Sequence, residues 1–167
     1  MRPPEKQDGT PTNELSLISF PTRQLFAQKL EEFDLVIFDR YRRRGVLPII
    51  YLSNIARYVA EGGALLTATG PSFASPYSLF RTPLAEVLPA RPSGQILEAG
   101  FKPAVSVEGL RHPVTANLPG ANNPEQGLEA EWGHWFRLVG VDQLSGDTVM
   151  EGPDGKPLLI LDRFGEG

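Results

Sequence analysis

The chain has 167 residues, of which 41% are hydrophobic and 22% are charged, which fits one globular domain with a sizeable core. Its formal net charge of −4 argues against a general nucleic-acid binder, because such proteins gather Lys and Arg against phosphates. The lack of cysteine excludes disulfides, thiolate metal sites and every cysteine nucleophile.

The first predicted elements are a linker, a helix and a strand. Residues 1–14 are rich in Pro, Gly, Thr and Asn, which predicts a loop or linker. The apolar run at 15–20 predicts a short strand or extended segment. Helical spacing at 23–32, with Thr22 as N-cap, predicts a helix. The continuously apolar run within 34–39, bounded by two aspartates, predicts a buried parallel strand.

A second helix and a second buried strand follow. Pro48 fits the first turn of a helix, and residues 49–61 continue it until the glycine pair Gly62–Gly63 ends it. Four of its residues should face the core: Ile50, Ile55, Tyr58 and Val59. Ala64–Thr69 predicts the next buried strand, so that strand, helix and strand form a right-handed parallel βαβ unit.

The second half of the chain predicts less regular structure. A short helix around 83–88 precedes extended segments in 94–107 and a turn-rich stretch from 112 to 127. A strand is expected within 132–139. Finally, Pro153-Asp154-Gly155 predicts a hairpin turn between two strands. We therefore expect one domain at 15–167, with a parallel sheet followed by an irregular, partly antiparallel half.

Several segments carry a family resemblance. Residues 33–39 (FDLVIFD) and 58–66 (YVAEGGALL) resemble the class I glutamine amidotransferase-like superfamily, and 156–167 looks like its closing hairpin. More narrowly, residues 6–15 and 38–48 (FDRYRRRGVLP) are similar to a domain of large uncharacterised proteobacterial membrane proteins. The resemblance implies a three-layer, flavodoxin-like α/β fold with a mainly parallel sheet. It also implies a soluble domain of a bacterial inner-membrane protein, and leaves the side of the membrane open.

Compared with that family, both ends of the chain look cut. Family members carry a βα unit before this chain begins and a strand after the turn at 165–167. We therefore expect a fragment, whose attachment to the membrane runs through parts of the parent protein. A fragment without a central strand exposes an unpaired sheet edge. That edge should pair with a second copy in a homodimer, or with the chain's own segment 15–20.

The resemblance places Thr69 or Gly70 where an amidotransferase has its catalytic cysteine. A threonine hydroxyl needs a terminal amine or a strong base nearby, and the next residues, 71–73, offer no base. The simpler interpretation is a strand end whose threonine hydroxyls hydrogen-bond to backbone amides of the following loop. Glutamine hydrolysis is therefore not expected, and neither a cofactor nor a metal site is indicated.

Four arginines follow directly on the first predicted buried strand: Arg40, Arg42, Arg43 and Arg44. Open α/β sheets bind ligands at the carboxyl ends of their strands, and guanidinium groups bind phosphates and carboxylates in bidentate fashion. We therefore predict a contact with an anion or with an acidic partner surface. The alternative is a solvated loop with one arginine paired to Asp39 or Asp34.

A second candidate surface combines Asp39 with Trp132 and His134. Strand alternation would place Trp132 and His134 on one side and Trp135 on the other, and aromatic side chains with polar tips can form a binding surface. The alternative is an aromatic strand that lines the core.

These residues favour a non-catalytic binding or interaction domain, with an unknown protein or a small anionic ligand as its partner. Two alternatives stay open. A hydrolase or transferase with non-cysteine chemistry needs a histidine or an acid beside Thr69. A small-ligand sensing domain, for a sugar or a nucleotide, uses the same cleft and needs no base.

Overall fold

The computed structural model of the protein describes residues 21–43, 45 and 47–166. The predicted linker at 1–14 and the predicted strand at 15–20 lie outside the described residues, as does Arg44. In the part of the chain that is described, no helix is long and apolar enough to cross a membrane.

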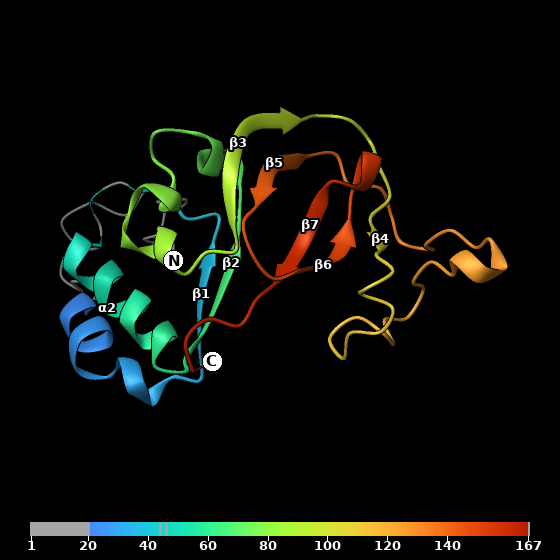
Figure 1. The fold of residues 1–167 in the computed structure, drawn as a ribbon. Helices are drawn as coiled ribbons and strands as arrows, with labels where there is room; N and C mark the ends of the chain where they lie inside the picture. The colour runs from blue at the N-terminus through green and yellow to red at the C-terminus, as the bar shows by residue number, and fades with distance from the viewer. Residues whose placement is uncertain (1–20, 44, 46, 167) are drawn as a thin grey trace, which may run out of the picture.

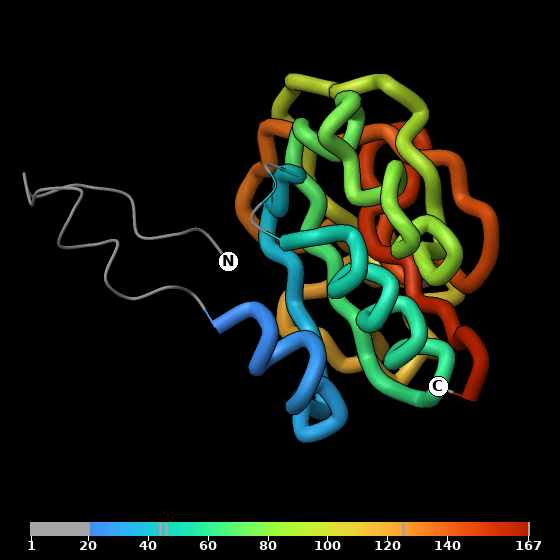
Figure 2. The backbone as a smooth tube through the Cα atoms, turned by 90° about the vertical axis from the view of Figure 1, so that its left-hand side faces the viewer, coloured from blue at the N-terminus to red at the C-terminus, as the bar shows by residue number. Residues whose placement is uncertain are grey.

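The predicted parallel strand–helix–strand unit is present (Figure 1). It consists of strand β1 (Leu35–Asp39), helix α2 (Ile49–Ala60) and strand β2 (Ala64–Ala68). β1 and β2 pair in parallel, from Leu35 opposite Ala64 to Asp39 opposite Ala68, which confirms the predicted pairing. Figure 2 shows α2 crossing in front of the two strands, with the C-terminal segment beside the end of α2. There the Glu166 amide donates to the Ala60 carbonyl.

The ends of α2 follow from its flanking residues. Pro48 has φ −54° and ψ 148°, so it lies just before the helix and not inside its first turn. Gly62, with φ 105°, adopts a left-handed conformation after the helix that glycine tolerates best. Leu52 and Ile55 are fully buried, whereas Ile50, which was expected to face the core, is 62% exposed.

Residues 23–32 do not form the predicted α-helix. They fold into a π-helical turn, η1 (Gln24–Gln28), and a 3-10 turn, η2 (Leu30–Glu32). Thr22 is not the cap, because Arg23 holds that position and makes no side-chain capping bond. So short a segment is marginal as a free helix, and packing decides its shape. Here the Asn54 amide of α2 donates to the Phe26 carbonyl (2.9 Å).

The other strands form two small antiparallel sheets. β3 (Ala90–Leu97) pairs with β5 (Leu138–Gln143), and β6 (Asp147–Glu151) pairs with both β4 (Ala104–Val105) and β7 (Pro157–Leu161). The expected three-layer flavodoxin-like fold with a mainly parallel sheet is therefore wrong. Parallel pairing needs a long crossover, usually helical. After β2, every helical segment of the described chain is a 3-10 turn of three or four residues.

The predicted elements of the second half are confirmed in part. β6 and β7 are joined by the predicted turn at 153–155, where Asp154 has φ 58°. The strand expected within 132–139 begins only at Leu138. Before that point, Trp135 makes an isolated bridge to Phe101 and no continuous strand.

One face of the β1–β2 pair is exposed, although both strands were expected to be buried. Phe38 is 4% exposed and belongs to the core that also contains residues of α2. Because side chains alternate along a strand, Leu35, Ile37 and Leu66 lie on the opposite face. They are 45%, 52% and 41% exposed. β1 and β2 therefore each have one face packed against the core and one exposed face.

Candidate functional site

The carboxyl ends of β1 and β2 bring together two segments that the sequence singles out. The arginine loop (residues 40–44, described for 40–43) begins where the Arg40 amide donates to the Ala68 carbonyl (2.7 Å). A Cβ atom added to Gly70 would lie 3.2 Å from the Arg40 Cγ atom. The arginine loop and Thr69–Gly70, which the family resemblance places at the cysteine position, are therefore direct neighbours.

Arg40 makes the chain turn sharply at the end of β1. Its φ of 45° lies in the left-handed region, which is uncommon for a residue other than glycine. Its Nε atom lies 3.4 Å from the Asp39 Oδ1 atom, and both side chains are mostly exposed. Such a surface ion pair contributes at most about 1 kcal/mol. One arginine is thus paired with Asp39, as the alternative interpretation of this loop required.

Tyr77 holds the rest of the arginine loop. The Arg42 guanidinium carbon lies 4.5 Å from the centre of the Tyr77 ring. The Arg43 amide donates to the Tyr77 carbonyl (3.2 Å), and the Tyr77 amide donates to the Ser75 hydroxyl (3.1 Å). Among the described residues, neither Arg42 nor Arg43 forms an ion pair. Two positive charges at this sheet end therefore lack a described carboxylate partner.

Tyr41 anchors the arginine loop from the inside. Its ring meets the Phe38 ring edge-on, with 5.1 Å between centres, and its carbonyl accepts a hydrogen bond from the Ser72 hydroxyl. Burial raises the pKa of the Tyr41 hydroxyl, and the Leu47 backbone amide and the charge of Arg43 lower it by less. The buried hydroxyl oxygen forms no full hydrogen bond. Tyr41 therefore acts mainly as an apolar anchor.

Thr69 is exposed, and the groove that it lines also contains the carboxylate of Asp162. His112 accepts a hydrogen bond from the Val114 amide (3.2 Å) at its Nδ1 atom, within the turn-rich stretch. His134 is exposed, and neither histidine lines the groove that Thr69 lines. Asp162 accepts a hydrogen bond from the Ser145 hydroxyl, and no described hydrogen bond joins it to Thr69.

A groove of about 700 Å³ runs along the free edge of β2. It extends from Arg40 and Gly70 towards Phe164, with β2 on one side and β7 on another. Trp135 and Arg137 also line it, and sequence reasoning missed both. The groove combines an apolar wall with arginine side chains.

Asp39, Trp132 and His134 were expected to share one cleft, and the structure does not bring them together at the groove, which none of them lines. The Trp132 indole instead donates to the Pro119 carbonyl (2.8 Å) within the irregular stretch of the chain. The aromatic residue at the groove is Trp135, which belongs to the other side of the expected strand.

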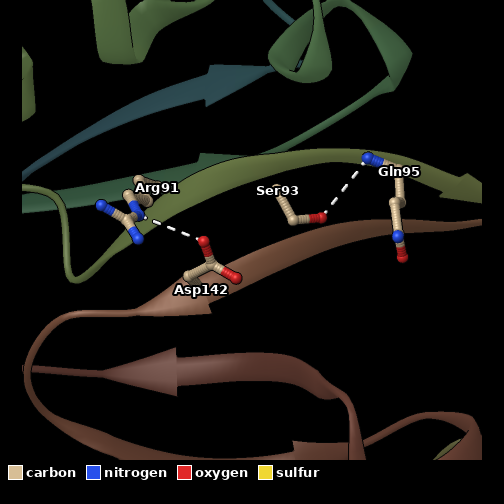
Figure 3. Close-up of polar contacts among 4 residues, drawn as sticks. All are labelled: Arg91, Ser93, Gln95 and Asp142. Carbon is tan, nitrogen blue, oxygen red and sulfur yellow. Dashed lines mark hydrogen bonds and ion pairs between the residues drawn. The ribbon is translucent and has the colours of Figure 1, made fainter.

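A second opening, of about 430 Å³, lies between β3 and β5 (Figure 3). Residues 93–95 of β3 face Gly140 alone, so the ladder widens there. Two of its polar side chains have partners: Asp142 binds Arg91 (3.1 Å), and the Ser93 hydroxyl accepts from the Gln95 backbone amide (3.3 Å). The charged side chains that line this opening, Asp142 and Lys156, have ion-pair partners, whereas Arg42 and Arg43 have none among the described residues.

No metal site is present among the described residues, since no group of three or more His, Cys, Asp and Glu side chains could hold an ion there. Comparison with known proteins gives no relative: no family model, no curated protein and no solved structure matches the chain. The geometry at the ends of β1 and β2 is therefore the basis for a functional hypothesis.

Proposed function

We propose that this chain is a non-catalytic binding domain whose arginine loop holds an anionic group of a partner protein or a small ligand. The observation that carries the proposal is Arg42, stacked on Tyr77 beside Arg43, at the carboxyl ends of two parallel strands. The resemblance of residues 38–48 to domains of proteobacterial inner-membrane proteins supports a place in such a parent protein.

The stacking of Arg42 favours anion binding for a geometric reason. An aromatic ring occupies the flat face of a guanidinium group, while the N–H donors lie in its plane and stay free. The stack also restricts the side chain before a ligand arrives, so less conformational entropy is lost on binding. Arg42 is therefore oriented to donate two parallel hydrogen bonds to a phosphate or a carboxylate.

The local charge supports the same ligand class. Asp39 is the acid next to the loop, and it already contacts the Arg40 Nε atom. The positive charges of Arg42 and Arg43 therefore remain uncompensated by a described carboxylate, although the whole chain carries a net charge of −4. Because salt screens exposed charges over about 10 Å at 0.1 M, binding should weaken as ionic strength rises.

The groove beside β2 favours a small-ligand sensing domain as the second candidate function. Its volume of about 700 Å³ lies in the range of ligand pockets, and Arg40 stands at its border. Non-cysteine hydrolysis has less support, because neither histidine lines this groove and the Asp162 carboxylate in it accepts a hydrogen bond from the Ser145 hydroxyl.

Thermal unfolding in phosphate, at constant ionic strength set with chloride, tests the proposed site. Phosphate should protect the wild type in a saturable way, and it should not protect an Arg42→Ala/Arg43→Ala variant. An Arg111→Ala/Arg163→Ala variant is the matched control, because it removes two exposed arginines outside the loop. Equal protection of all three proteins would show that the arginine loop is not an anion site.

A further inference from the structure

The groove beside β2 has an unpaired strand edge on each side. In the described chain, β2 pairs only with β1, and β7 is the outer strand of the sheet β4–β6–β7. All five residues of β2 and all five residues of β7 line the groove. Two edges that belong to different sheets therefore face the same space (Figure 1).

Backbone groups of β2 point into this groove. The Arg40 amide donates to the Ala68 carbonyl, so the backbone groups of Ala68 face β1. Because backbone groups alternate along a strand, those of Leu65 and Thr67 point the other way, into the groove. No hydrogen bond to the backbone of either residue is found from the rest of the described chain. The groove therefore offers free N–H donors and C=O acceptors beside its apolar side chains.

β7 runs antiparallel to β2 across the groove. The Glu166 amide donates to the Ala60 carbonyl, and a Cβ atom added to Gly62 would lie 3.7 Å from the Glu166 carbonyl oxygen. The chain leaving β7 thus reaches the start of β2 (Figure 1). A strand placed between them would run parallel to one and antiparallel to the other, and both kinds of pairing form regular ladders. At 3.2–3.4 Å per residue, the length of β2 gives such a strand about 16 Å.

We propose that the groove binds an extended strand of a partner polypeptide, with apolar side chains at alternate positions. Main-chain hydrogen bonds to a sheet edge supply affinity in this mode of recognition, and pockets for alternate side chains supply specificity. The buried residues Phe73, Leu88 and Val139 line the groove and offer that apolar contact. An alkyl chain would fill the same space and leave the backbone groups of Leu65 and Thr67 without partners, so the free edges single out a peptide.

The charged residues of the groove add a second property of the partner. Arg40 lines the groove where β2 ends, beside the arginine loop, and Asp162 lines it where β7 ends. Because the two strands are antiparallel, these charges lie at opposite ends, whereas Arg137 in the groove is already paired with Glu98. Charge complementarity favours a strand with an acid at the Arg40 end and a base at the Asp162 end. The contact of that acid with the arginine loop rests on the anion-binding function proposed above.

Hydrogen exchange by NMR on the free protein tests the strand edge first. The Leu65 and Thr67 amides should exchange at least about tenfold faster than the Leu66 and Ala68 amides, which face β1. Protection of Leu65 and Thr67 in the free protein would overturn the proposal. If that protection rose with protein concentration, a second copy would fill the groove, and if it did not, the chain itself would fill it.

Two synthetic peptides then probe the groove in both chain directions: acetyl-Lys-Val-Thr-Val-Thr-Val-Asp-amide and acetyl-Asp-Val-Thr-Val-Thr-Val-Lys-amide. At least one of them should bind in the micromolar to millimolar range and slow exchange at Leu65 and Thr67 by about tenfold or more. The same peptide with N-methylated valine amides should not bind, because a strand between two others uses the amides of both its edges. Failure of both peptides, or equal binding of the N-methylated form, would overturn the proposal, as would binding of dodecanoate in place of either peptide.

Two proline variants form a matched pair. Thr67→Pro removes an amide that points into the groove, and Ile37→Pro removes one that points away from β2 at the far edge of β1. Thr67→Pro should weaken peptide binding by about tenfold, the effect of one lost hydrogen bond, and Ile37→Pro should bind as the wild type does. Circular dichroism confirms that each variant is folded, and the N-methylated peptide gives the same test on the wild type alone. Equal weakening in both variants would contradict the assigned edge.

Replacing Asp by Asn in the bound peptide separates the groove from the anion site. The Asn peptide should still bind, by about two- to fivefold more weakly, because one exposed ion pair is lost. Equal affinity of the Asp and Asn peptides would overturn the contact with the arginine loop and leave the strand assignment intact. Loss of all peptide binding would overturn the strand assignment, even where phosphate still protects the wild type.

Discussion

The guanidinium group of Arg42 lies over the ring of Tyr77, 4.5 Å from its centre. The two residues come from different connections: Arg42 follows β1, and Tyr77 lies in the turns after β2. The Arg43 amide binds the Tyr77 carbonyl as well, so one residue fixes the backbone and a side chain of the arginine loop. The ring of Tyr77 therefore restricts the Arg42 side chain, and its carbonyl fixes the backbone at Arg43.

Tyr77→Ala should weaken phosphate binding by a factor of about 2 to 5. A cation–π contact at an exposed site contributes about 0.5–1 kcal/mol, which corresponds to this factor. Tyr77→Phe keeps the ring and should bind phosphate as the wild type does. Isothermal titration calorimetry measures both. Wild-type affinity in Tyr77→Ala would mean that the stack does not orient Arg42 for binding.

Tyr41→Phe should keep or raise the free energy of unfolding at neutral pH. The Tyr41 hydroxyl is buried without a full hydrogen bond, and such a group costs about 1–3 kcal/mol. Tyr58→Phe is the control, because it removes a hydrogen bond to the Phe33 carbonyl and should lose about 0.5–1.5 kcal/mol. Urea unfolding measures both variants. Equal losses in the two variants would contradict the assignment of Tyr41 as an apolar anchor.

The stability of the wild type and of Tyr41→Phe should depend differently on pH. Burial raises the pKa of Tyr41 in the folded state above the ordinary value of 10.0. The unfolded chain therefore ionises first, and wild-type stability should fall as pH rises through about 10 and the folded pKa. Tyr41→Phe should lose less stability over that interval. An identical loss in wild type and variant would show that Tyr41 ionises equally in both states.

No ammonia release from glutamine is expected. Neither histidine lines the groove that contains Thr69, and the Asp162 carboxylate there accepts a hydrogen bond from Ser145, so no described histidine activates the Thr69 hydroxyl. Thr69→Cys should be inactive too, because a thiol at this position still lacks a histidine partner. A coupled assay for ammonia measures both proteins. Release above the buffer background that Thr69→Ala abolishes would contradict this prediction.

Gly109→Ala should destabilise the protein by about 1–3 kcal/mol, the usual effect of overpacking a core. A Cβ atom at Gly109 would overlap the Val149 carbonyl oxygen, so the turn that contains Gly109 lies directly against β6. Gly133→Ala is the control, since its Cβ atom would meet nothing within 4 Å, and it should change stability by less than about 0.5 kcal/mol. Similar values for both variants would show that Gly109 is not a close contact.

Local signals in the sequence predicted the β1–α2–β2 unit and the hairpin turn at 153–155. The apolar runs, Pro48 and the glycine pair act over a few residues, so their effect is readable from the chain itself. The exposed face of β1 was not predictable in this way. An apolar run such as Leu35–Phe38 looks the same whether one face or both faces are covered.

The candidate site was predictable only in part. The four arginines stand out as a run, but Tyr77 is distant in sequence and nothing near it marks it as their partner. The prediction that Trp132 and His134 share a face assumed a strand. Residues 132–137 form no continuous strand, so alternation does not apply there, and Trp135 lines the groove instead.

Heteronuclear NMR with inorganic phosphate tests the central claim most directly. At constant ionic strength, the amide signals of Arg40, Arg43 and Gly70 should shift together and saturate, because these groups surround the proposed site. The amide signal of Gly140, which lines the second opening, should stay in place. Shifts at Gly140 with none in the arginine loop, or no saturable shift in either place, would contradict the claim that the arginine loop binds anions.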